Sequence, residues 1–449
     1  MGKNEFKNAI VDARKDLRPG QIGILGLQHL FAMFGATVLV PIITGLSVST
    51  TLLFAGLATL FMHLVTKRKI PVFLGSSFAF IGGYAAVKEA GVGLGFTEEV
   101  ALNYACIGVA CAGLLYLVLS LICKVWGSTN VMKYFPPVVT GPIIIAIGLT
   151  LAPSAINNCE TNWLIALVAI VVVIVCNIWG KGMIKIIPIL LGVVASYLVA
   201  AFTGNVDFTA VKDAAWFGLP VVWERTGLSV FAGETDWNFL VSAIVMIVPI
   251  AFATMMEHVG DISAIGGTVG KNFIAEPGLH RTLIGDGVGT AIAALFGAPA
   301  NTTYGENTGV LALTKVYDPF VIRLAAIYAV VLSCCPKFAA IIEVMPAATI
   351  GGVSIILYGM ISAIGVRNMV ENHTNFQNTR NVIVAAIILG LAIGIAYSAA
   401  GAISFGKISL SGLAVASIVG IILNAILPGK DYSFAENPNE NLASSLGKY

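Results

Sequence analysis

Long apolar runs without charged side chains limit what this chain can fold into. The first runs from residue 19 to residue 66. It is long enough for two membrane-spanning helices of about 20 residues each, with a turn at residues 45–49. Twelve further mainly apolar stretches follow, at 71–91, 102–123, 135–153, 163–180, 184–203, 238–258, 281–298, 300–315, 319–335, 346–365, 381–398 and 409–428. The pattern predicts an all-α polytopic membrane protein with about fourteen transmembrane segments.

The composition excludes the main classes of soluble protein. Of the 449 residues, 57% are hydrophobic and only 11% are charged, whereas a soluble domain has about a quarter charged residues. A large soluble enzyme is therefore ruled out. The formal net charge is +2 and the basic residues are scattered, so no nucleic-acid partner is expected. The expected surroundings are a lipid bilayer.

The charge distribution predicts both orientation and domain boundaries. With both termini cytoplasmic, twenty of the 25 Lys and Arg residues fall on the inner side, as the positive-inside rule requires for an even number of spans. We therefore expect a multi-pass protein of the cytoplasmic (inner) cell membrane. Its predicted parts are a cytoplasmic N-terminal segment (1–20), a first repeat of seven spans (21–203), a polar extracytoplasmic loop containing short strands (204–237), a second repeat of seven spans (238–428) and a cytoplasmic tail (429–449).

The two halves carry matching landmarks. His29 lies 49 residues before Phe78 in the first half, and His258 lies 48 residues before Glu306 in the second. Because each half has an odd number of spans, two copies of one unit must have opposite topology. Inverted repeats of this kind are typical of secondary transporters.

The third and tenth spans are unsuited to a continuous helix. Both begin at a proline, Pro71 or Pro299, and continue with glycine and hydroxyl residues. Proline removes a backbone donor, and irregular backbone is tolerated at membrane depth only where it is buried in protein or lines a cavity. The pattern predicts short extended strands leading into half-helices, with the binding site between them.

Four acidic residues lie in or beside apolar spans of the second half: Glu257, Asp261, Asp286 and Glu306. Each is costly in a bilayer unless it is paired, protonated or facing a cavity, so they are candidates for substrate and proton binding. Glycines on both sides of Asp286 leave open a role in packing or in bonding a neighbouring span. His29 and His258 are interpreted as hydrogen-bonded within the protein rather than catalytic. The spacing around Glu257 and His258 is not that of a zinc protease, so no metal site and no cofactor other than the proton is expected.

Three motifs together resemble a known family. Glu306-Asn307-Thr308-Gly309 is followed by Thr314-Lys315, and Gln28-His29 lies in the first span. With the segments at 27–36, 74–80 and 301–307, these residues are similar to the nucleobase–ascorbate transporter family of nucleobase symporters, in particular its uracil permease branch. The resemblance extends from about residue 20 to residue 428.

The resemblance implies a fold and a function. Spans one to four and eight to eleven would form a core domain, and the other six a gate domain, in a protein that is often a homodimer. The implied activity is uracil import by proton symport, with alternating access between core and gate, and not enzymatic catalysis. The implied site residues are Phe78, Glu257, Gly305, Glu306 and Ala36 for uracil, Glu257, Glu306, Asp261 and His258 for proton coupling, and His29, Asp286 and Asn307 for support.

Other functions stay open at this point. Xanthine and urate members of the family usually have Gln where this chain has Glu306, which favours a pyrimidine. A small anion is a second possible substrate, although converging carboxylates disfavour it. A third possible function is that of a membrane-embedded hydrolase, but the sequence contains no Ser–His or zinc motif that supports it. The sequence does not decide whether the coupling ion is a proton or sodium. It also does not decide whether the substrate is uracil or a close pyrimidine analogue.

Overall fold

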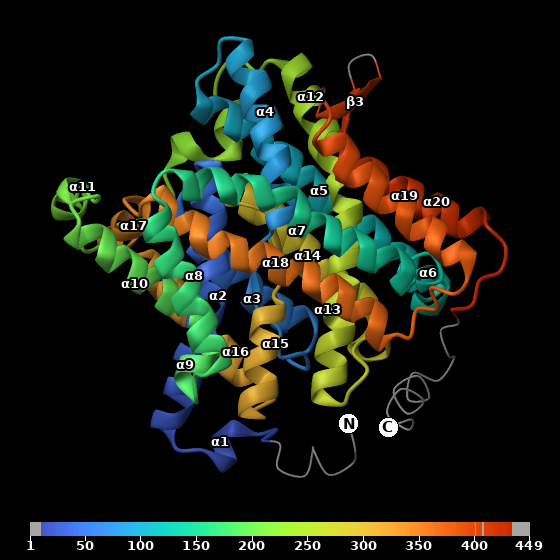
Figure 1. Cartoon of the computed structure of the whole chain (residues 1–449), viewed down its shortest axis with the longest axis horizontal. Helices are drawn as coiled ribbons and strands as arrows, with labels where there is room; N and C mark the ends of the chain where they lie inside the picture. Colours follow the sequence, from blue (N-terminus) through green and yellow to red (C-terminus); the bar gives the residue numbers. More distant parts are fainter. Residues whose placement is uncertain (1–9, 400, 406–407, 433–449) are drawn as a thin grey trace.

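The computed structural model describes residues 10–399, 401–405 and 408–432, and it is helical almost throughout (Figure 1). The elements of the first half are α1 (Ala13–Asp16), α2 (Pro19–Thr44), α3 (Val48–Val65), β1 (Leu74–Ser76), η2 (Phe78–Phe80), α4 (Ile81–Gly93), α5 (Glu98–Trp126), α6 (Ser128–Met132), α7 (Pro137–Glu160), α8 (Trp163–Ile178), α9 (Met183–Ile186) and α10 (Pro188–Phe202). Those that follow are α11 (Thr209–Asp213), η3 (Trp223–Arg225), η4 (Gly227–Phe231), α12 (Trp237–Ile247), η5 (Val248–Ile250), α13 (Ala251–Val269), η6 (Ile274–Gly278), α14 (Leu279–Leu295), β2 (Asn301–Thr303), α15 (Gly305–Thr314), α16 (Pro319–Ser333), α17 (Pro336–Glu343), α18 (Ala347–Glu371), α19 (Thr379–Ala396), β3 (Ala402–Phe405), β4 (Ile408–Ser411) and α20 (Gly412–Ile426).

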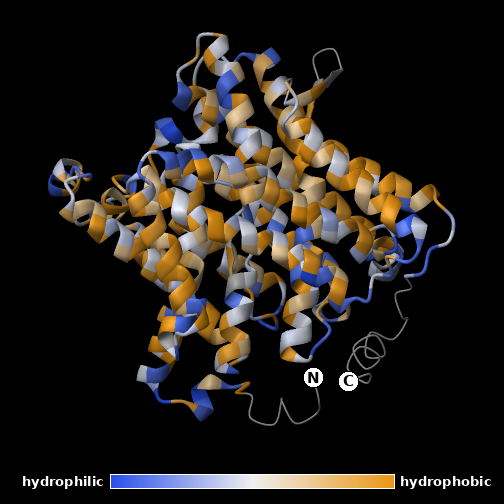
Figure 2. Cartoon of the chain, viewed as in Figure 1, coloured by the Kyte–Doolittle hydropathy of each residue, from blue (hydrophilic) through white to orange (hydrophobic). Residues whose placement is uncertain are grey.

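Many of these helices are long and apolar enough to cross a bilayer. Seven meet that description by length and composition, and an eighth is the pair α16 and α17, which is bent by 87° at its break. The fourteen predicted stretches each contain a helix, and the predicted turn at 45–49 follows the end of α2. Hydrophobic residues dominate along these helices, while hydrophilic ones gather in the connecting loops (Figure 2). The molecule is a helical membrane protein, and the number fourteen stays a prediction because several helices are short.

Glycines let α14 lie between α3 and α5. A Cβ atom added to Gly285 would be 2.4 Å from Met62 Sδ on α3, and one added to Gly287 would be 2.5 Å from Tyr116 Cβ on α5. Such approaches are possible only where the side chain is missing, as in the small-residue interfaces of membrane helices. The glycines beside Asp286 therefore allow close helix packing. Packing was one of the two roles considered for this part of the helix.

A second close contact joins α7 and α18, which run side by side across the middle of the molecule (Figure 1). A Cβ atom on Gly148 would be 2.2 Å from Tyr358 O, and one on Gly365 would be 2.6 Å from Gly141 O. The apolar stretches at 135–153 and 346–365, predicted as separate spans, are thus direct neighbours.

The two predicted extended segments form one antiparallel strand pair. Strand β1 pairs with β2 in the register Leu74 to Thr303, Gly75 to Thr302 and Ser76 to Asn301. The ladder continues at both ends, because Ser77 N donates to Ala300 O (2.8 Å) and Tyr304 N donates to Phe73 O (3.1 Å). The expectation of short strands in the third and tenth spans is confirmed.

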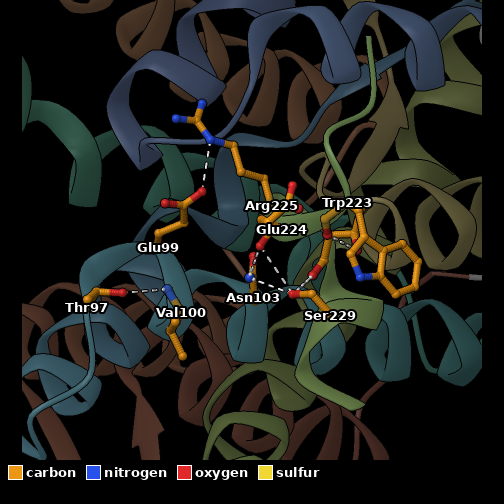
Figure 3. A network of polar contacts seen from close by, with 9 residues as sticks. Thr97, Glu99, Val100, Asn103, Trp223, Glu224, Arg225 and Ser229 are labelled. Atoms are coloured by element: carbon orange, nitrogen blue, oxygen red, sulfur yellow. Dashed lines mark hydrogen bonds and ion pairs between the residues drawn. The ribbon is translucent and has the colours of Figure 1, made fainter. Parts of the chain in front are cut away.

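The loop at 204–237 differs from its prediction, because it contains no strand. Its backbone forms α11, η3 and η4 with local bonds such as Thr226 N to Trp223 O. The Asn103 side chain on α5 donates to Glu224 O (2.7 Å), and Arg225 pairs with Glu99 (3.0 Å; Figure 3). These contacts satisfy the loop from the side, so no neighbouring strand is needed to pair its backbone groups.

Candidate functional site

A pocket lies where the strand pair meets α13, α7 and α18. Its cavity volume is about 30 Å³. Its walls are formed by Phe78, Ile144, Glu257, Asp261, Thr302, Thr303, Tyr304, Gly305, Ile361 and Ile364. Mostly buried polar groups therefore face apolar side chains across one small space, which is the usual character of a small-molecule site.

The two halves of the chain reach the pocket in the same way. Each strand ends directly before a helical segment, so that η2 begins at Phe78 and α15 begins at Gly305. Backbone N–H groups in the first turn of a helix have no partner inside that helix. At Gly305 and Glu306 such groups lie beside the pocket and can donate to an acceptor on a ligand.

Two carboxylates of α13 contribute to one wall. Glu257 and Asp261 are one turn apart, so their side chains share a helical face, and both line the pocket. Asp261 Oδ2 accepts a hydrogen bond of 2.7 Å from Thr303 Oγ1 on β2. This bond ties the acidic helix to the strand pair and fixes Asp261 in position beside the ligand space.

Tyr304 is a site residue that the sequence analysis missed. Its hydroxyl donates to Ser76 O (2.9 Å) and accepts from Thr37 Oγ1 (3.2 Å), which joins β2, β1 and α2. A Cβ atom on Gly75 would be 2.4 Å from the Tyr304 ring, so the glycine is required for this contact. The available signal was an aromatic residue within an otherwise small and polar segment.

Each strand is anchored at its first residue by a threonine of a neighbouring helix. Thr59 Oγ1 on α3 accepts from Leu74 N (2.9 Å) and donates to Leu74 O (3.3 Å). Thr290 Oγ1 on α14 accepts from Asn301 N (3.2 Å) and donates to Asn301 O (3.0 Å). Both strands are therefore anchored to a neighbouring helix by the same two bonds, although the side chains of the strands differ.

Apolar side chains close the opposite side of the pocket. Ile144 comes from α7, and Ile361 and Ile364 come from α18. The Phe78 ring meets the Tyr358 ring edge to face, with centroids 5.6 Å apart. A flat ring bound against Phe78 would thus have aromatic and aliphatic contacts on one side and polar groups on the other.

The supporting residues form two buried contacts outside the pocket lining. Asn307 Nδ2 donates to His29 O (3.0 Å) and lies 3.2 Å from His29 Nδ1, which fixes α15 against α2. His258 Nδ1 lies 2.9 Å from Asp286 Oδ2, and its Nε2 lies 2.9 Å from Thr282 Oγ1. Asp286 therefore lies in close contact with a side chain of the neighbouring helix α13.

The structure brings four of the predicted site residues together: Phe78, Glu257, Asp261 and Gly305. Ala36 is buried in α2 and is not among the residues of the pocket wall. The backbone of Glu306 lies in α15, while its side chain is outside the described part of the chain. No group of three or more His, Cys, Asp or Glu side chains within the described ranges is arranged to hold a metal ion.

Comparison with known sequences gives consistent results. The sequence pattern described as "Permease family" matches residues 20–401. The uracil permease of Bacillus caldolyticus is 41% identical over 451 residues, covering 97% of this chain and 99% of the relative. The uracil permease of Bacillus subtilis (strain 168) is 40% identical, covering 90% of this chain and 91% of the relative.

One solved structure shares the fold at low sequence identity. It is the transmembrane domain of a cyanobacterium bicarbonate transporter, with a TM-score of 0.59 and 15% identity. The match covers 93% of this chain and 99% of the other. It shows how the helices are arranged and says nothing about the solute carried by this chain.

Proposed function

Since the chain belongs to the nucleobase–ascorbate transporter family of permeases, we propose that it imports uracil across the cytoplasmic membrane by proton symport. The relatives are named as permeases, which are transporters and not enzymes. Two of them are named for uracil, and the chemistry of the pocket supports the same substrate here.

The observation that carries the proposal is the placement of hydrogen-bond acceptors and donors around one pocket. Uracil is a neutral ring with two N–H donors and two carbonyl acceptors. Carboxylate oxygens at Glu257 accept from an N–H group, and first-turn backbone N–H groups at Gly305 and Glu306 donate to a carbonyl. Phe78 packs on the ring. We assign the Glu306 side chain to the second N–H group on the family resemblance.

Proton coupling is assigned to the acidic face of α13. A carboxylate that changes its protonation state when the ligand binds links the two equilibria reciprocally. Glu257 and Asp261 share the pocket wall, and His258 follows Glu257 in the chain. In this proposal Glu257 and Glu306 respond to the ligand, while Asp261 and His258 accept or release the transported proton.

We further propose fourteen spans in two inverted repeats, divided into core and gate, with alternating access between them. The strand pair supports the repeat, because each half contributes one strand and one threonine that anchors it. β1 and Thr59 in the first half correspond to β2 and Thr290 in the second. The division into core and gate is supported by the pocket, whose polar wall comes from α13 and the strands and whose apolar wall comes from α7 and α18. A homodimer with cytoplasmic termini completes the proposal.

The test is uptake of labelled uracil into proteoliposomes, with and without an inward proton gradient and with sodium absent. We expect accumulation that is lost when the gradient is dissipated. Equilibration that ignores the gradient would contradict proton symport. Absence of uracil uptake by correctly folded protein, with uptake of labelled xanthine or bicarbonate in its place, would contradict the substrate assignment.

A further inference from the structure

Three arginine side chains gather far from the pocket, at the end of the molecule that the charge bias assigns to the cytoplasm. Arg14 comes from α1, Arg68 from the turn between α3 and β1, and Arg323 from the second turn of α16. The Cζ atoms of Arg14 and Arg323 lie 5.1 Å and 5.5 Å from the centroid of the Phe320 ring. Arg14 and Arg323 therefore share one aromatic ring, and the charge of Arg68 also opposes that of Arg323; we group the three as one basic cluster.

Backbone contacts hold this cluster in place. Ile10 N donates to Lys315 O (2.9 Å), and Tyr317 N donates to Ile10 O (2.8 Å). The segment that carries Arg14 is therefore fixed against the connection between α15 and α16. These bonds fix the backbone near Arg14 relative to that near Arg323, while the Arg14 and Arg68 side chains are exposed.

The positive charge of the cluster is only partly balanced. Asp318 is the carboxylate that attracts Arg323. Its two oxygens already accept from Ala13 N (2.9 Å) and Phe320 N (2.8 Å). The nearby Asp12 pairs with Lys15 at 3.3 Å. One carboxylate, engaged by backbone, thus opposes three guanidinium groups that stay charged at any physiological pH.

A buried donor in the cluster lacks an acceptor. Among the described residues, Arg323 Nη1 is shielded from solvent and has no hydrogen-bond partner. Leaving a buried donor unpaired is unfavourable, and more so for a charged group. Both the charge and this donor call for an anion with several acceptor oxygens.

We propose that Arg14, Arg68 and Arg323 form a binding site for a phosphate-bearing anion. Guanidinium groups bind phosphate oxygens in pairs, with favourable geometry as well as charge. Basic clusters at the cytoplasmic membrane surface bind anionic lipid headgroups, and a soluble phosphate offers the same chemistry. Arg68 lies in the turn before β1, and Arg323 follows α15. A bound anion therefore connects the turn before β1 with the helix that follows α15, and it stabilises them together.

The experiment measures the melting temperature of the full-length protein in lipid nanodiscs without uracil. One set of discs contains only phosphatidylcholine, and the other contains about one-third phosphatidylglycerol. Inorganic phosphate is added to the neutral discs in a separate arm, against chloride at the same ionic strength. The variants are Arg14→Gln and Arg68→Gln, whose side chains are exposed, together with Arg323→Gln. The matched control is Arg367→Gln, which removes an exposed arginine paired with Glu371 on α18.

We expect phosphatidylglycerol to raise the melting temperature of the wild type and of Arg367→Gln by several degrees. Each cluster variant should lose at least half of that rise. A rise with inorganic phosphate that depends on the same arginines would identify a soluble phosphate as the ligand. The proposal is overturned if neither anion raises the melting temperature, or if the rise is equal in the cluster variants and the control.

Discussion

At the residue scale, Glu257 is the side chain on which the proposed substrate chemistry depends most. Replacing it by Gln keeps the shape but substitutes a neutral amide for the carboxylate. Hydrogen bonds to charged groups contribute about 1.5–3 kcal/mol, so we expect Glu257→Gln to weaken uracil binding by about 10- to 150-fold. The measurement is uracil binding to purified protein by calorimetry.

The control for this substitution is Glu371→Gln, which changes an exposed carboxylate at the end of α18. It should leave the uracil dissociation constant unchanged. Wild-type affinity in Glu257→Gln would remove Glu257 from the binding site.

The buried pair of Asp286 and His258 permits a second prediction. Both side chains are fully buried, with Asp286 Oδ2 2.9 Å from His258 Nδ1. Removing one partner of a buried polar contact leaves the other unsatisfied, at about 1–3 kcal/mol. We expect Asp286→Asn to lower the melting temperature markedly while uracil affinity stays within about threefold of wild type, because Asp286 lies outside the pocket lining. An unchanged melting temperature would contradict its supporting role.

At the scale of elements, the threonine anchors of the strand pair can be tested as a matched set. Thr59→Val and Thr290→Val each keep the side-chain volume but remove two hydrogen bonds to a strand. The Leu74 and Asn301 backbone groups then lose a partner in a buried place, at about 1–3 kcal/mol. Both variants should melt earlier and bind uracil more weakly, by similar amounts.

Thr150→Val is the control for the anchors, since Thr150 Oγ1 donates only to carbonyls of its own helix, at Ala146 and Ile147. Its melting temperature should stay close to that of the wild type. A large effect in only one of the two anchor variants would argue against the equivalence of the two halves.

The sequence predicted the broken third and tenth spans because local signals define them. Proline at 71 and 299 and the polar residues at 301–308 are incompatible with a lipid-facing helix. Neither the pairing of β1 with β2 nor its register was predicted, since main-chain hydrogen bonds depend little on residue type. The 87° bend between α16 and α17 was not predicted, although Pro336, the first residue of α17, directly follows the apolar run at 319–335.

Contacts between distant segments were beyond sequence reasoning. The contact of Tyr304 with Thr37 and Ser76, and that of His258 with Asp286, depend on which helices become neighbours. The prediction of strands within 204–237 was wrong for a related reason. That loop is satisfied by the Asn103 side chain of α5, which is more than a hundred residues away in the chain.

At the scale of the whole molecule, the predicted orientation can be checked directly. Single cysteines replace Lys15, Glu234 or Lys430, three exposed positions, in a variant without the seven native cysteines. The positive-inside rule places Lys15 and Lys430 in the cytoplasm and Glu234 outside. An impermeant maleimide added to intact cells should label only Glu234→Cys, and permeabilised cells should show labelling of all three. Labelling of Lys15→Cys in intact cells would contradict the orientation.

The strand pair beside the pocket also bears on how such a protein changes over generations. Its ladder is made of main-chain atoms, and the paired segments Leu74-Gly75-Ser76 and Asn301-Thr302-Thr303 have no side chain in common at matching positions. Mutation can replace most of these side chains without disturbing the ladder. Proteins that evolve from this one can therefore acquire new solute preferences while keeping the same strand pair. If the two halves share an ancestor, the similarity of their backbones would remain detectable after the similarity of their sequences had been lost.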